Sequence, residues 1–201
     1  MGNSRNLANL LGTGSTIATA KIADDAITAA KIATNAVVAD GLSSSAITSA
    51  DLPAHSPIQT LHTSTTTFST ATTTSYSDVT GMSLTITPTA TNSLIRLSGV
   101  LCTAIQSTAS QVDVHGRTRI LRTFTGDSTE VFVIDLRTYD FNGGSVYVNT
   151  GLPFEFIDQP NTTLPVTYKF QGQEVSSGCT SVDFNAEADN RCSFIIQEIA
   201  G

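Results

Sequence analysis

Aliphatic residues recur at every fifth position between residues 17 and 52, a spacing that no single helix or strand can bury on one side. Five residues advance about 500° around an ideal helix, so successive side chains move away from any one face. In a strand an odd spacing sends them to alternate faces. Either each ten-residue unit folds as a short element plus a turn, or several copies of the chain surround a common axis. The residues are Ile17, Ile22, Ile27, Ile32, Val37, Leu42, Ile47 and Leu52.

Burial between chains is the better explanation of this repeat. One unit offers two aliphatic side chains, too few to offset the roughly 1–2 kcal/mol of backbone entropy that each ordered residue loses. The many Ala, Gly and Ser residues of the segment would let several backbones approach closely. A flexible linker is the alternative, although linkers are usually polar and aperiodic. We therefore expect residues 16–56 to form an extended, intertwined neck with the eight aliphatic residues as its core.

The rest of the chain has the composition of an all-β domain. It is rich in β-branched Thr, and the whole chain lacks Trp. Turn signals such as PTATNS, TGDS, FNGG and DQPNTT separate short runs, among them separate expected strands at 75–81 and 83–88, and at 145–149 and 152–158. Val166, Tyr168 and Phe170 share one face of their run, and the run at 192–200 is apolar enough for a central strand. The prediction is a mostly-β antiparallel sandwich, or jelly roll, over residues 57–201.

Two parts of the sequence resemble tailed-bacteriophage fibre and spike proteins. Units such as TAKIADDAITAAKIATNAV look like the neck repeats of these homotrimers. YSDVTGMSLTITPTATNSLIRLSG, then FIDQPNTTLPVTYKFQ, then SFIIQEIA are similar in order and spacing to the tumour-necrosis-factor-like jelly roll at the C-terminus of such fibres. The resemblance covers residues 16–52 and about 57–201, and it implies a homotrimer. The segment SSGCTSVDFNAEADNRC, residues 176–192, is longer or more polar than that pattern.

These observations predict three regions with different roles. Residues 1–15, with Leu7, Leu10 and Leu11, are expected to anchor the chain to another virion protein. Residues 16–56 are the neck, and residues 57–201 are a distal knob. The N-terminus lacks the basic start and apolar core of a signal peptide, and no run approaches the roughly 20 apolar residues of a membrane span. We expect a virion protein assembled in the bacterial cytoplasm without membrane insertion.

Charge and cysteine content exclude further classes. Seventeen acidic and ten basic side chains give a net charge of −7, without a Lys/Arg cluster, so a nucleic-acid partner is not expected. The odd set of Cys102, Cys179 and Cys192 indicates buried or free thiols, with a Cys179–Cys192 bridge as the alternative.

Catalytic signals are weak, and we predict neither an enzyme nor a cofactor. No G-x-S-x-G or H-E-x-x-H motif occurs. Asp113 and His115 could share one strand face as metal ligands, which is the alternative to a metal-free domain. A polysaccharide depolymerase would need two carboxylates, although acidic residues on strands usually lie on solvated faces. The candidates are Asp135, Asp140, Glu155 and Asp158.

Aromatic residues beside polar ones make sugar binding the stronger proposition. Tyr139, Phe141, Asn142 and Tyr147 are the candidate glycan contacts, and packing inside the sandwich is the alternative. The predicted function is a homotrimeric fibre or spike that attaches a phage to its host. A purely architectural head or tail decoration is the second interpretation.

Overall fold

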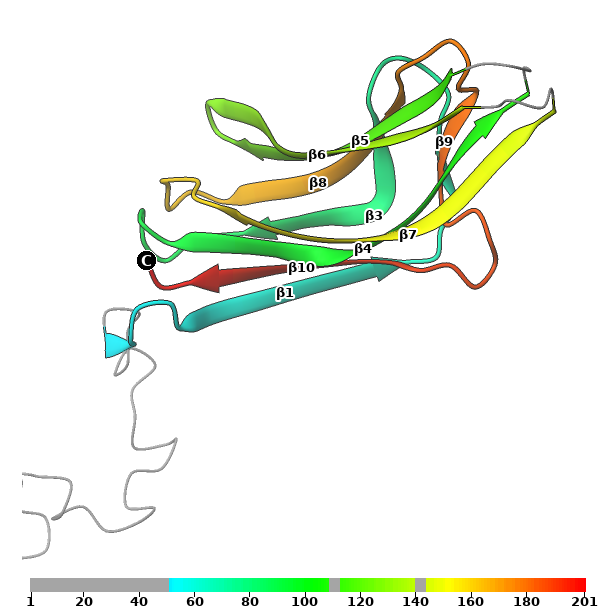
Figure 1. The fold of residues 1–201 in the computed structure, drawn as a ribbon. Helices are drawn as coiled ribbons and strands as arrows, with labels where there is room; N and C mark the ends of the chain where they lie inside the picture. The colour runs from blue at the N-terminus through cyan, green and yellow to red at the C-terminus, as the bar shows by residue number, and fades with distance from the viewer. Residues whose placement is uncertain (1–50, 109–112, 140–143) are drawn as a thin grey trace, which may run out of the picture. The chain divides into compact units, whose positions relative to one another are not determined.

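The computed structural model describes residues 51–108, 113–139 and 144–201 (Figure 1). The predicted anchor residues Leu7, Leu10 and Leu11 lie outside the described residues, as do Phe141, Asn142 and every predicted neck residue from Ile17 to Ile47. Leu52 is described and is partly exposed in the single chain. The intertwined neck, its trimeric core and the division at residues 15 and 56 therefore stay predictions.

The described residues form ten β-strands, and none of them belongs to a helix that could cross a membrane. The strands are β1 (Pro57–Thr65), β2 (Ser69–Ala71), β3 (Ser77–Ile86), β4 (Leu94–Ser107), β5 (Asp113–Phe124), β6 (Asp127–Tyr139), β7 (Val146–Asp158), β8 (Val166–Glu174), β9 (Ser181–Phe184) and β10 (Cys192–Ile199).

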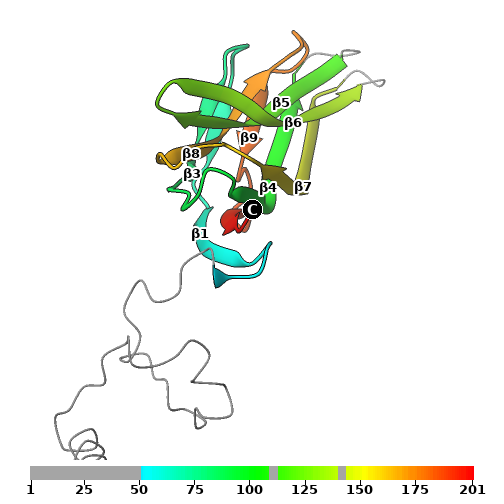
Figure 2. The same cartoon turned by 90° about the vertical axis from the view of Figure 1, so that its left-hand side faces the viewer.

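Two antiparallel sheets pack face to face. Sheet A has the order β1-β10-β4-β9-β2, with β7 along the other edge of β4, and sheet B has the order β3-β8-β5-β6. Figure 2 shows β5 and β6 layered over β4 and β7. The first and last strands are neighbours, with Leu61 opposite Ile196. Consecutive strands mostly alternate between the sheets, which is the arrangement of a jelly roll. The predicted antiparallel sandwich is confirmed.

The core lies between the sheets and is built from alternate residues of their strands. Val166, Tyr168 and Phe170 are at most 1% exposed, as their alternation predicted. The rings of Phe154, Phe170 and Phe194 join the two sheets, with centroids 5.0 to 6.1 Å apart. β10 lies between β1 and β4, so the prediction of a central C-terminal strand is confirmed.

The structure has fewer strand breaks than the sequence predicts. The runs at 75–81 and 83–88 belong to one strand, β3, whose register shifts between Asp78 and Ser83. Gly81 adopts φ of +79° inside that irregularity, a conformation that glycine accepts without strain. The runs at 145–149 and 152–158 also form one strand, β7. Pro153 is tolerated there because, of the described strands, β7 pairs with β4 alone, which makes it an edge strand in this part of the structure.

Two buried carboxylates stabilise the end of the sandwich where the described chain begins. The Asp158 carboxylate, on sheet A, accepts hydrogen bonds from Arg122 Nη1 at 2.9 and 3.0 Å and from the Tyr168 hydroxyl at 2.7 Å, both on sheet B. The fully buried Glu198 binds the β3–β4 turn. Its Oε1 accepts from the Thr89 amide at 2.6 Å and from the Ser93 hydroxyl at 2.6 Å. Both groups have structural partners, as buried charges need.

Candidate functional site

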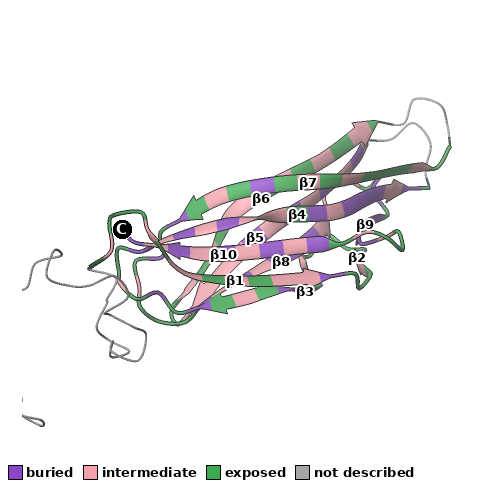
Figure 3. Ribbon diagram, turned by 90° about the horizontal axis from the view of Figure 1, so that it is seen from below, coloured by how far each residue is buried: buried purple, intermediate pink, exposed green. Residues whose placement is uncertain are grey.

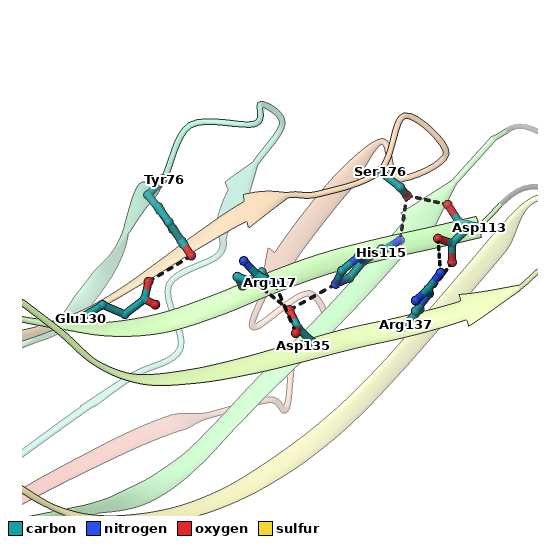
Figure 4. A network of polar contacts seen from close by, with 8 residues as sticks. All are labelled: Tyr76, Asp113, His115, Arg117, Glu130, Asp135, Arg137 and Ser176. Atoms are coloured by element: carbon teal, nitrogen blue, oxygen red, sulfur yellow. Dashed lines mark hydrogen bonds and ion pairs between the residues drawn. The ribbon is translucent and has the colours of Figure 1, made fainter.

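The outer face of sheet B is covered by paired charges. Arg117 Nε donates to Asp135 Oδ1 at 2.6 Å, and His115 Nε2 lies 3.1 Å from the same oxygen (Figure 4). Arg137 donates twice to the Asp113 carboxylate, at 2.8 Å each. These hydrogen bonds from arginine lower the pKa of both carboxyl groups. The side chains come from β5 and β6, whose register places residues 113, 115 and 117 opposite residues 139, 137 and 135.

This network does not bring the candidate metal ligands Asp113 and His115 together. Asp113 binds Arg137, whereas His115 faces Asp135, so the two candidate ligands are engaged with different partners. In the described ranges, no group of three or more His, Cys, Asp or Glu side chains is placed to hold a metal ion.

The three candidate acids in the described part of the chain do not form a glycosidase pair. Asp135 lies on the outer face of sheet B and Glu155 on the outer face of sheet A, while Asp158 is buried between the sheets. The two carboxyl groups of a glycosidase flank the glycosidic bond and lie roughly 5 to 10 Å from each other. The pKa values of Asp135 and Glu155 are lowered by their arginine partners, the opposite of what a general acid needs. Asp140 lies outside the described residues.

The outer face of sheet A has a different character over the half of the sheet nearer the C-terminus, and we call that half face A. It consists of the outward side chains of β1 and β10 and of the adjoining stretches of β4 (Leu94–Val100) and β7 (Pro153–Asp158); the ribbons of these strands are seen from below in Figure 3. In these four fully described strands, Arg96 and Glu155 are the only outward Lys, Arg, Asp or Glu residues, and they pair with each other at 3.0 Å. Polar Ser98 and Gln197 lie opposite Glu155 and Arg96. Exposed aliphatic side chains lie on the same face: Ile157 is 51% exposed and Val100 is 37% exposed, and Ile195 and Ile199 are partly exposed.

An open hollow of about 690 Å³ lies at the far end of sheet A. It is lined by side chains from the β1–β2 connection and from β2, β4, β7 and β9 with the residues that flank β9. The C-terminus lies at the opposite end of the sandwich (Figure 1), where the His55 amide donates to the Ala200 carbonyl at 2.9 Å. The lining residues are Phe68, Thr70, Thr72, Gln106, Tyr147, Thr180, Ser181, Asp183 and Ala186.

Of the two predicted glycan contacts that the structure describes, Tyr139 and Tyr147, one lines the hollow. Tyr147 lines it and is 42% exposed, whereas Tyr139 is 47% exposed at the end of β6 and is not among the lining residues. Sequence reasoning missed Phe68, which lies in a Thr-rich run without a distinguishing pattern. It also missed Asp183, although the departure of residues 176–192 from the phage-fibre pattern was a signal for that segment.

The three cysteines carry free thiols. Cys179 and Cys192 are buried without a bridge between them. The Cys192 thiol contacts the backbone of Cys102, with its Sγ 3.3 Å from the Cys102 amide nitrogen. Burial raises the pKa of Cys192 to about 11, so its thiol stays protonated at neutral pH.

Comparisons with known proteins give only distant likenesses. No protein-family model and no curated protein matches the chain. Among solved structures, it is similar to a chain of the infectious bursal disease virus Gx strain, with 14% identity and a TM-score of 0.36 over 74% of this chain and 33% of that chain. It is also similar to the VP2 subviral particle of infectious bursal disease virus, with 13% identity and a TM-score of 0.35 over 74% of this chain and 38% of that chain. The chain spans little more than a third of the length of these viral chains, and likenesses this distant assign it no function.

Proposed function

We propose that this chain forms a homotrimeric fibre or spike of a tailed bacteriophage, whose β-sandwich is a knob that attaches the particle to the host surface. Residues 1–15 would bind another virion protein and residues 16–56 would form the neck. The resemblance of the repeat and of the C-terminal segments to phage fibres supports the viral and trimeric parts of this proposal. The jelly-roll topology is the one that this resemblance implies.

Face A is the observation that carries the proposal. A sheet face that stays in water is usually covered by charged and polar side chains, as the outer face of sheet B is. Face A instead has a single ion pair, uncharged polar residues and the exposed or partly exposed aliphatic side chains of Ile157, Val100, Ile195 and Ile199. Depletion of charge together with exposed aliphatic side chains is characteristic of the centre of a protein interface. A second and a third copy of the chain would cover this surface.

Attachment through a trimer gains strength from multivalency. Three copies of a weak site on one rigid body raise each other's effective concentration, so the trimer binds a surface more tightly than one site does. The net charge of −7 for each chain favours host surfaces that are not strongly anionic.

Two measurements on the full chain test this proposal. Light scattering should give a mass three times the chain mass of 21.0 kDa, and a monomer at micromolar concentration would contradict the trimer. The purified protein should also block adsorption of the phage to its host cells. A stable trimer that neither binds cells nor blocks adsorption would overturn the attachment function and leave an architectural decoration.

A further inference from the structure

We propose that the hollow between Phe68 and Tyr147 binds an uncharged carbohydrate. This inference rests on the proposed attachment function and names the ligand class of its contact site. Two aromatic rings border the hollow from different parts of the chain, Phe68 from the β1–β2 connection and Tyr147 from β7. Phe68 is 55% exposed and Tyr147 is 42% exposed. Two water-exposed aromatic rings beside one hollow offer flat apolar faces to a ligand.

The floor of the hollow is polar and already ordered. Thr70 Oγ1 donates to Asp183 Oδ1 at 2.6 Å, and Ser181 Oγ lies 3.1 Å from Asp183 Oδ2. The Asp183 side chain is therefore fixed by β2 and by its own strand, β9. A carboxylate has about four acceptor positions, so each Asp183 oxygen can accept a further hydrogen bond from a ligand hydroxyl. Gln106 brings an amide to the same floor, with its Oε1 3.4 Å from Ser181 Oγ.

This combination of surfaces matches a sugar ring. A pyranose has an apolar face of C–H groups, which packs on an aromatic ring, and a rim of hydroxyl groups, which donate to carboxylates and amides. The hollow offers both kinds of partner, and its volume of about 690 Å³ lies within the range of small-ligand sites. A purely apolar ligand would exclude water from the remaining acceptor positions of the Asp183 carboxylate without replacing its hydrogen bonds, at a cost in free energy.

The charges around the hollow select against acidic sugars. The lining residues that the structure describes include no lysine or arginine. Glu187 Oε1 lies 3.3 Å from the Tyr147 hydroxyl, and Asp183 forms part of the floor. A uronic or sialic acid would place its carboxylate near two others with no compensating cation, so the hollow favours an uncharged hexose or N-acetylhexosamine.

Saturation-transfer NMR on the full-length protein tests the site with four probes: the methyl glycosides of glucose, galactose, mannose and N-acetylglucosamine. At least one should bind saturably, while sialic acid should not bind. Phe68→Ala and Tyr147→Ala should each weaken that binding about tenfold. Both side chains are substantially exposed, so their removal should leave the fold intact. Tyr139→Ala is the matched control, because Tyr139 is equally exposed but does not line the hollow.

Three results would overturn the site. The first is that none of the four glycosides binds, and the second is that the wild-type protein and the Tyr147 variant bind a glycoside equally well. The third is a change of assembly mass in the Tyr147 variant, because that result would make the hollow a contact between subunits. The phage-adsorption assay tests the attachment function separately. Protein that blocks phage adsorption without binding any glycoside would remove the sugar site alone. Protein that binds a glycoside without blocking adsorption would remove the attachment function and leave the site.

Discussion

The two sheets of the sandwich have similar inner faces and opposite outer faces. Inward, both contribute tightly packed aliphatic and aromatic side chains. Outward, sheet B carries arginines, lysine and carboxylates joined in ion pairs across its strands, such as Arg117 with Asp135 and Lys169 with Asp78. Face A carries isoleucines and small polar residues around one ion pair. The inner faces explain why the chain folds, whereas the outer faces distinguish a surface in contact with water from one that favours a partner.

The largest difference should appear when the same charge is added to each outer face. Ile157→Asp on face A should weaken the proposed trimer by at least about 2 kcal/mol at each subunit interface, because a charge would be buried there without a partner. Val133→Asp is the matched control on sheet B, since Val133 is a 37% exposed aliphatic residue of β6. Analytical ultracentrifugation of the full chain should show dissociation of the first variant only. Equal behaviour of the two variants would remove the distinction between the faces.

A smaller effect should separate a buried carboxylate of sheet A from the exposed ones of sheet B. Burial disfavours the charge of Glu198, but hydrogen bonds from Ser93, Gln59 and Thr89 outweigh it and hold its pKa below the ordinary value of 4.5. A carboxyl group whose pKa is lower in the folded state stabilises that state above its unfolded pKa, and this contribution is lost as the pH falls. Glu198→Gln should therefore cost about 1–3 kcal/mol at pH 7.

The pH dependence provides the second readout for Glu198. Urea unfolding of the wild-type protein should show a loss of stability below about pH 4.5, and the glutamine variant should lose less over the same interval. An identical pH profile for both proteins would contradict the role assigned to Glu198.

The smallest effect is expected on the outer face of sheet B. Asp135→Asn removes the partner of Arg117, but the Asp135 side chain is 48% exposed. Exposed ion pairs contribute at most about 1 kcal/mol, and salt screens them. Thermal unfolding should change little at physiological salt, and the difference from wild type should shrink further at 1 M salt. A large, salt-independent loss would mean that this charged face is itself part of an interface.

The sequence predicts the inward residues better than the outward ones. Alternation alone identified the buried face of Val166, Tyr168 and Phe170, because a two-residue period follows from strand geometry. The partners of the outward charges depend on which strands become neighbours and in which register, and neither His115 nor Arg117 carries that information locally. The hollow also depends on which strands become neighbours, because Phe68 and Asp183 are brought together by the pairing of β2 with β9.

The candidate site was therefore found only in part. Tyr147 was predicted as a glycan contact and lines the hollow, since an aromatic residue among polar neighbours is visible in the sequence. The position of Tyr139 away from the hollow follows from the course of β6, which composition does not determine. Bulges also escaped prediction, because a glycine such as Gly81 marks a turn and an irregular strand equally well.

The pairing of the first strand with the last has a consequence for how the protein is made. Among the described strands, β10 is the one neighbour of β1 in sheet A, so this pairing must wait until nearly the whole sandwich has left the ribosome. At about 5–20 residues per second this interval lasts several seconds or more. Meanwhile β4 lacks the partner of its first half, Leu94–Val100, and presents an open strand edge. Nascent chains on one polysome therefore expose this open β4 edge while they are close together, which favours aggregation. A product that ends before Cys192 would lack β10 and would keep the edge open.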